Sequence, residues 1–226
     1  MNKLFYISIL VIIFSCKTEK PKVVEDKLEV TTDIANLEKE ALAAYAINPL
    51  SALPLFDSLS TACEKANNLA KQAITELNMA NIYDEHAQKF TRANYHAHKS
   101  LAIWETLNDT MQMANLLKYS GYINGELGNF EIGKRQIDKA IEFYNIKNFE
   151  EGKAVSYFNM ARVIFLEGNY KSCEQFFRLS KSYWLKKNNV GRVIPINDFG
   201  IKLYSKLGDD KMVEKLKLEN QALLNK

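Results

Sequence analysis

The amino-acid sequence predicts an all-α fold in which about five helix–turn–helix pairs stack into a solenoid. The first observation is a repeat: ELGNF at residues 126–130 recurs as LEGNY at 166–170 and, more weakly, as LGDD at 207–210. The second is that apolar and small residues within each copy are spaced mostly by threes and fours, which is typical of one face of an α-helix. The third is the fixed period of forty residues, since helix pairs repeated at such a period bury their apolar faces by stacking on one another.

Residues forty positions apart share the same character in several columns of the repeat. Two columns are aromatic, at Phe90, Phe130 and Tyr170 and at Trp104, Tyr144 and Trp184. Two are small, at Ala93, Gly133 and Cys173 and at Ser100, Ala140 and Ser180. One is asparagine, at Asn68, Asn108, Asn148 and Asn188. A small residue lets a neighbouring helix approach closely and an aromatic ring fills the space between layers, so these columns predict the contacts between helices.

Glycine and asparagine mark the expected helix boundaries. Gly128 and Gly168 suit the left-handed residue that ends a helix, whereas Gln88 takes that place in the earliest copy. The asparagines tolerate the same conformation or cap the next helix. Asn48-Pro49 is expected to form the first turn and begin the second helix, and Pro195 is expected in the first turn of its helix. The expected pairs are 33–47 with 50–66, 69–86 with 89–106, 109–127 with 129–146, 149–167 with 169–187, and about 193–206 with 209–225.

The ends and the charge of the chain add two expectations. The last helix is rich in lysine and has a narrow apolar stripe of Met212, Leu216 and Leu223, as the final helix of a solenoid requires. The formal net charge of +3 is spread along the chain without a basic block, so the sequence does not predict nucleic-acid binding.

The first residues differ in composition from the rest of the chain. The short positive segment MNK precedes LFYISILVIIF at residues 4–14, an apolar run of eleven broken only by Ser8. Eleven helical residues span about 16 Å, whereas a membrane's hydrocarbon core is about 30 Å thick. The run is therefore too short for an ordinary spanning helix and matches the apolar region of a signal peptide.

The segment Ile13-Phe14-Ser15-Cys16 resembles the lipobox of bacterial lipoproteins. The resemblance implies cleavage before Cys16 and acylation of its sulfur, for example with palmitate. Phe14 is bulkier than the strict pattern prefers, although lipoproteins of the Bacteroidota tolerate such a residue. The alternatives are an uncleaved anchor and a plain secretory signal. The expected domains are a signal peptide at 1–15, a lipidated cysteine and flexible tether at 16–31, and a repeat domain at 32–226.

The spacing of the repeat columns resembles that of the tetratricopeptide repeat (TPR). The matching positions are Gly121, Gly128, Phe130, Gly133 and Ala140 in one copy, and Ala161, Gly168, Tyr170, Cys173 and Ser180 in the next. Two departures are the period of forty rather than thirty-four and the replacement of a helix-ending proline by Asn145 and Leu185. Kinesin-light-chain-like arrays have such longer helices. The resemblance implies a right-handed α-solenoid that binds a protein or peptide partner.

In TPR arrays the first helix of each pair lines a concave groove. The resemblance therefore implies that the groove receives Asn78, Ile82, Glu85, Asn115, Lys118, Tyr122, Glu126, Phe158, Arg162 and Phe165, with Asp198 and Lys202 at its end. The alternative for Phe158 and Phe165 is packing between layers. Rings that anchor an extended segment and basic groups that bind its carboxylates are typical of a peptide-binding surface.

No constellation typical of catalysis occurs in the sequence, so we expect no enzyme, metal or cofactor. His96 and His98 lie two apart on a helix, point to different faces, and are expected to be surface or groove residues. Cys63 and Cys173 either pair or, as the simpler interpretation, are two buried thiols. The predicted function is a lipid-anchored scaffold for protein–protein interaction in the bacterial envelope, on the periplasmic side, with the cell surface as the alternative location. The alternative is an accessory surface lipoprotein for nutrient capture, of glycan or peptide.

Overall fold

The structure of the protein, a computed structural model, describes residues 22–225. The predicted signal peptide and Cys16 lie outside the described residues. Within them the chain forms α-helices and one short 3₁₀ helix, and no strand. The elements are α1 (Lys22–Ile47), η1 (Pro49–Ala52), α2 (Leu53–Lys65), α3 (Leu69–Glu85), α4 (Phe90–Thr106), α5 (Thr110–Glu126), α6 (Phe130–Ile146), α7 (Glu150–Leu166), α8 (Tyr170–Lys186), α9 (Val190–Leu207) and α10 (Asp210–Leu224).

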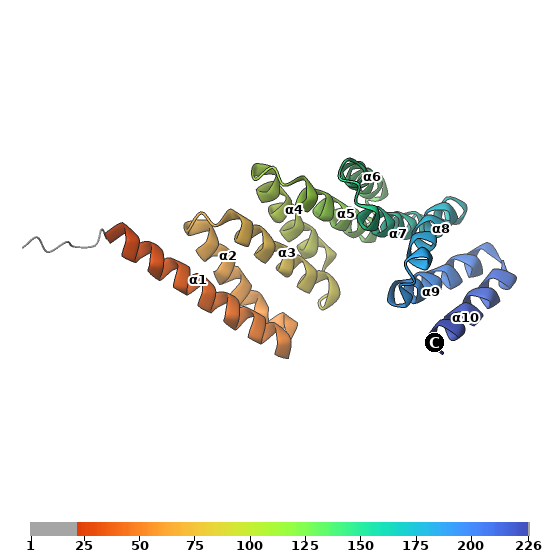
Figure 1. The fold of residues 1–226 in the computed structure, drawn as a ribbon, viewed down its shortest axis with the longest axis horizontal. Helices are drawn as coiled ribbons and strands as arrows, with labels where there is room; N and C mark the ends of the chain where they lie inside the picture. Colours follow the sequence, from red (N-terminus) through yellow and green to blue (C-terminus); the bar gives the residue numbers. More distant parts are fainter. Residues whose placement is uncertain (1–21, 226) are drawn as a thin grey trace, which may run out of the picture.

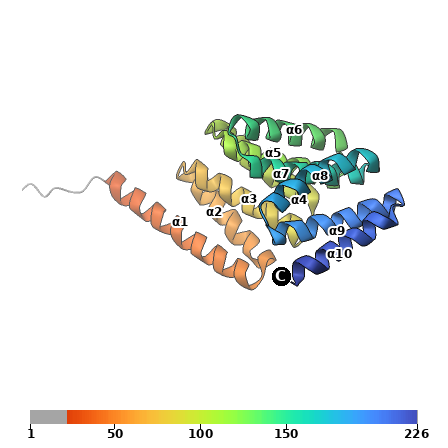
Figure 2. The same ribbon diagram turned by 45° about the vertical axis from the view of Figure 1, so that its right-hand side comes forward.

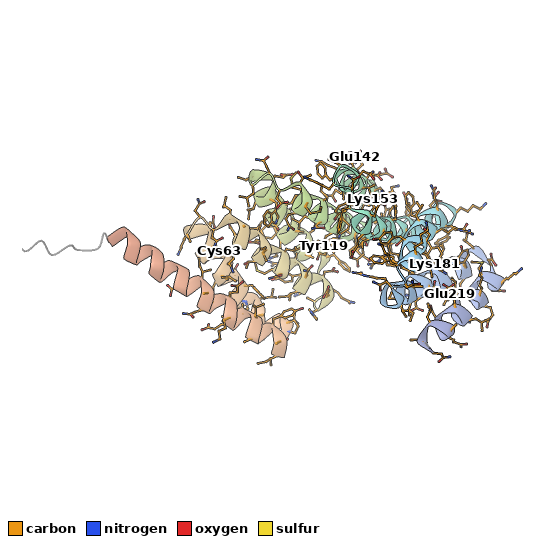
Figure 3. The ribbon with its side chains drawn as sticks, in the orientation of Figure 1. Cys63, Tyr119, Glu142, Lys153, Lys181 and Glu219 are labelled. Atoms are coloured by element: carbon orange, nitrogen blue, oxygen red, sulfur yellow. The ribbon has the colours of Figure 1, made fainter. Side chains whose placement is uncertain are left out.

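The helices stack in chain order into a curved array. Each helix packs against the next one along the chain, and α5 also contacts α7. The first pair, α1 and α2, and the last pair, α9 and α10, lie on the same side of the central helices (Figures 1 and 2). An ion pair between Lys181 of α8 and Glu219 of α10 connects the last two helix pairs, with Nζ and Oε2 2.8 Å apart (Figure 3). The predicted solenoid of five helix pairs is therefore confirmed.

Left-handed residues end most of the helices at a strict interval. Positive φ angles recur every twenty residues, at Gln88, Asn108, Gly128, Asn148, Gly168, Asn188 and Gly208. At the end of α5 the Gly128 N–H donates to the Gly125 carbonyl (3.0 Å) and the Asn129 N–H donates to the Asn124 carbonyl (2.8 Å). This pair of bonds is the Schellman arrangement, which satisfies the last carbonyls of a helix. The repeat of forty is thus two units of one helix and one turn each.

The first member of the asparagine column caps a helix, whereas the other members have the left-handed conformation. Asn67, and not Asn68, has the left-handed conformation after α2, with φ 53°. Asn68 instead caps α3, because its side chain accepts a hydrogen bond from the Lys71 N–H. Both roles of asparagine that the sequence predicts therefore occur at this turn.

The small columns are where paired helices cross. A Cβ atom on Gly133 of α6 would lie 2.5 Å from the Gly121 carbonyl oxygen of α5. At the equivalent crossing the Cys173 thiol of α8 lies 3.1 Å from the Ala161 carbonyl oxygen of α7. Beside these crossings the second aromatic column is buried, at Trp104, Tyr144 and Trp184. The columns therefore are packing columns, as the sequence predicts.

Three expected boundaries are wrong. Helix α1 begins at Lys22, so residues 22–31 of the predicted flexible tether are helical. Pro49 begins a short 3₁₀ helix and α2 starts only at Leu53, because four residues of tighter helix complete the turn. Helix α9 begins at Val190, so Pro195 lies in its second turn and not its first. A proline there removes one hydrogen bond within the helix.

The remaining expectations about the core agree with the structure. Cys63 and Cys173 are both free and fully buried. On α10 Leu216 is buried while Leu218 and Leu224 are exposed, so the last helix presents a narrow apolar stripe to α9 and a mainly polar surface to solvent. None of the helices in residues 22–225 has the length and apolar character needed to cross a membrane.

Candidate functional site

The central inner face of the array carries a polar cluster that joins three first helices. We call it the inner row, and it consists of Asp84 on α3, Tyr119, Tyr122 and Glu126 on α5, and Arg162 on α7. Tyr119 lies near the middle of the array (Figure 3), and its hydroxyl donates to the Ala80 carbonyl of α3 at 3.0 Å. This bond spans the space between α3 and α5, whereas α5 and α7 touch directly.

Arg162 and Tyr122 form the centre of the inner row. The guanidinium carbon of Arg162 lies 3.8 Å from the centroid of the Tyr122 ring, and Nη2 lies 3.4 Å from Glu126 Oε1. The planar guanidinium stacks on an aromatic face and keeps its edges for hydrogen bonds. About a third of the Arg162 side chain (35%) is exposed, so both its edge and the ring can contact another molecule. The sequence predicts that these two residues lie together, and the structure brings them together.

Burial shifts the titration of this cluster. Burial, with a further contribution from the neighbouring Glu85, raises the pKa of the Asp84 carboxyl, and the positive charge of Arg162 opposes that rise. Burial also raises the pKa of Tyr122 to about 12, again against the effect of Arg162. Both tyrosines of the inner row are thus neutral donors near neutral pH, because burial raises the pKa of Tyr119 as well.

Lys118 and Asn115 lie on the same helix and face the second helix of their own pair. Asn115 Oδ1 accepts a hydrogen bond from the Tyr144 hydroxyl at 2.7 Å. Lys118 Nζ lies 5.9 Å from the centroid of the Tyr144 ring. Burial, together with the charge of Arg192, lowers the pKa of Lys118. Asn115 therefore holds α6 against α5, and Lys118 is a partly buried lysine beside the same tyrosine ring.

Three predicted groove residues lie elsewhere or serve another purpose. Ile82 is 1% exposed and belongs to the core between α2 and α3, so its assignment to the groove is wrong. Phe158 and Phe165 both pack on Phe199 of α9, with ring centroids 5.4 and 5.3 Å apart. They are partly buried against the core, which is the alternative of packing between layers.

Asn78 lies at a second feature of the inner face. Together with Leu42 and Tyr45 of α1, Phe56 of α2 and Asn81 of α3 it lines a cavity of about 170 Å³. Leu42 is 51% exposed and Tyr45 is 38% exposed, so an exposed apolar surface borders the side chains of Asn78 and Asn81. At the other end of the face Asp198 accepts a hydrogen bond from Asn220, and Lys202 is exposed.

The expectation for His96 is wrong, because this residue is buried. Its Nδ1 lies 2.7 Å from Glu76 Oε2, and Glu76 is fully buried on α3. Ser60 of α2 and Lys99 of α4 bond to the other oxygen of the same carboxylate, at 2.7 and 2.6 Å. A charged residue among the small and apolar positions of α3 is the sequence signal that was missed. Across the part of the chain that the structure describes, no three His, Cys, Asp or Glu residues gather as a metal site would require.

Known structures with this architecture are TPR-like repeat proteins. BtubC (BKLC) from P. vanneervenii superimposes with a TM-score of 0.60 at 12% identity, covering 87% of this chain and 91% of that one. A putative kinesin light chain with nearly identical TPR-like repeats from Podosopora anserina gives 0.65 at 11% identity, covering 84% and 96%. No protein-family model and no curated protein matches the sequence.

The likeness identifies the fold as a TPR-like α-solenoid. Proteins built from such repeats generally bind protein partners and generally have no catalytic activity. The inner row connects three first helices of this fold through side-chain contacts, so it is the candidate site of this chain.

Proposed function

We propose that the inner row binds an extended segment of a protein partner. The observation that carries the proposal is the stack of Arg162 on Tyr122 beside Glu126, a half-buried ring and cation at the centre of a curved face. Interface residues of this kind, Tyr and Arg in partly desolvated positions, contribute most of the binding energy at protein interfaces. The inner row offers both charges, since Asp84 and Glu126 are carboxylates and Arg162 is a cation.

We further propose that the chain is a lipoprotein of the bacterial envelope and is not an enzyme. The support is the lipobox-like segment that ends at Cys16, which follows an apolar run of signal-peptide length. A lipid on Cys16 would hold the solenoid close to a membrane, on the periplasmic side. The inner row would then present its partner-binding face within the envelope.

The test of the interaction is a pull-down from membranes with the full chain and three single variants. Tyr122→Ala and Arg162→Ala remove the two halves of the stack, and each is expected to weaken partner capture by about thirtyfold or more. Lys186→Ala, on the exposed surface of α8, is the matched control and should capture the partner as wild type does. Circular dichroism of all three should show unchanged helicity. If both inner-row variants still capture the partner and the control variant does not, the binding surface lies on the outer helices.

The anchor is tested separately. Cys16→Ala should accumulate as an uncleaved precursor that incorporates no labelled palmitate, because the acylated sulfur is absent. A variant that is still labelled and processed would refute lipidation at this cysteine. A glycan array with the wild-type chain distinguishes the two predicted roles, since a scaffold for proteins should bind no oligosaccharide on it.

A further inference from the structure

The outer face of the array contains a cavity that the inner row does not explain. It lies between α2 and α4, over α3, and has a volume of about 450 Å³. We call it the outer cavity. Its polar lining residues are Asp57 of α2, Tyr83 of α3, and Arg92, Tyr95, His96 and Lys99 of α4.

The α4 wall of the outer cavity is cationic. Arg92, His96 and Lys99 are spaced by four and three residues, which places them on one face of the helix. Lys99 and His96 are held in place from below, because both bond to the fully buried Glu76 carboxylate. A carboxylate in this position needs such partners to offset the cost of burial. The two groups therefore meet the cavity in a fixed arrangement.

Each of these three side chains keeps a free polar atom for a ligand. The Glu76 carboxylate accepts from His96 Nδ1, so Nε2 is the ring nitrogen that remains, and it makes no hydrogen bond within residues 22–225. Lys99 has three donors, of which Glu76 uses one. Arg92 is exposed and makes no ion pair to the described residues.

The opposite wall carries a single acid. Asp57 of α2 lines the same cavity and likewise makes no ion pair within the described part of the chain. Tyr83 stacks parallel to the His96 ring on the floor, with centroids 5.3 Å apart, and Tyr95 is 57% exposed at the rim. The cavity thus offers cations on one side, an acid on the other and aromatic rings between them.

We propose that the outer cavity binds a free amino acid. The ligand's carboxylate would bind Arg92 and Lys99, its ammonium group would bind Asp57, and its side chain would lie on the tyrosine rings. A zwitterion is the ligand whose two charges can pair with both Arg92 and Asp57. Hydrolysis is not part of the proposal, because the Ser60 hydroxyl donates to Glu76 and not to His96.

The experiment is isothermal titration calorimetry on the full chain in detergent. The probes are L-phenylalanine, L-leucine and L-glutamate, with N-acetyl-L-phenylalanine and L-phenylalaninamide as forms that each lack one charge. At least one free amino acid should bind, and removal of either charge should weaken its binding by about tenfold or more. The dipeptide glycyl-L-phenylalanine, whose charges lie further apart, should also bind about tenfold more weakly.

Two variants connect the binding to the cavity. Arg92→Gln and Asp57→Asn should each weaken binding by about tenfold or more, with unchanged unfolding midpoints because both side chains lie at the surface. Lys171→Gln, on the exposed face of α8, removes a charge away from the cavity and should bind as wild type does. No binding of any free amino acid, equal binding of the acetylated or amidated form or of the dipeptide, or unchanged binding by Arg92→Gln would each overturn the proposal.

Discussion

The substitution Gly133→Ala tests the close contact between α5 and α6. Its Cβ atom would lie 2.5 Å from the Gly121 carbonyl oxygen and 3.3 Å from the Gly125 backbone nitrogen. Both neighbours are backbone atoms, so no side chain can rotate away and α5 and α6 must separate. Overpacking of this kind costs about 3 kcal/mol, whereas the better helix propensity of alanine returns about 1 kcal/mol. The expected net loss of stability is therefore about 2 kcal/mol.

The assay is urea unfolding followed by circular dichroism, with a thermal scan beside it. For a domain of this size a loss of about 2 kcal/mol lowers the melting temperature by about 4–8 °C. The control is Gly191→Ala on α9, where the nearest atom to a new Cβ is Asn189 Oδ1 at 3.7 Å. That variant gains helix propensity without a clash and should be as stable as wild type or more so. A Gly133→Ala protein as stable as wild type would refute the reasoning about the small columns.

Three further predictions rest on individual contacts. Hydrogen bonds from His96, Lys99 and Ser60 outweigh the effect of burial and hold the pKa of the Glu76 carboxyl below 4.5. The stability that this carboxylate contributes is therefore present above that pH and is lost as the pH falls through the folded pKa. Glu76→Gln should flatten the dependence of the urea midpoint on pH below about 4.5. Gln88→Gly should stabilise by about 1 kcal/mol because Gln88 has φ 50°, while Asn108→Gly should gain less because asparagine tolerates this conformation. Burial raises the pKa of the Cys63 thiol, and it raises the pKa of the Cys173 thiol to about 12. Iodoacetamide at pH 8 should therefore modify both cysteines only after unfolding. Rapid modification of the native chain would contradict their burial.

The turns explain why most of the fold could be predicted from the sequence. A left-handed residue every twenty positions limits each helix from both sides, so the helices from α3 to α8 agree with the expected bounds to within one residue at each end. The start of α1 could not be found in this way, because no glycine or asparagine of the repeat precedes it. Residues 22–31 have mixed charge and little apolar periodicity, and apolar periodicity is the main signal on which a sequence-based helix assignment depends.

The candidate site was predictable only in part. Helical spacing shows which residues share a face of one helix, whereas the expectation that Tyr122 and Arg162 share the groove came from the resemblance to TPR arrays, and the structure places these two side chains in contact. Helical spacing does not show what covers the face. Phe158 is covered because Phe199 of the next pair packs on it, a contact between residues forty-one positions apart. The Glu76–His96 pair could not be predicted for the same reason, since its two residues lie on different helices and neither helix alone requires the other.

One glycine outside the repeat columns connects the packing of the array to the proposed interaction surface. A Cβ atom on Gly125 of α5 would lie 2.6 Å from Val163 Cγ2 of α7, so these two first helices approach as closely as they do only because residue 125 has no side chain. The same contact includes a hydrogen bond from Asn159 Nδ2 to the Lys118 carbonyl, at 3.3 Å. Arg162 is the residue before Val163, and its stack on Tyr122 depends on this separation. A larger residue at position 125 should therefore move α7 away and open the stack, and partner capture should fall even though the inner row itself is unchanged.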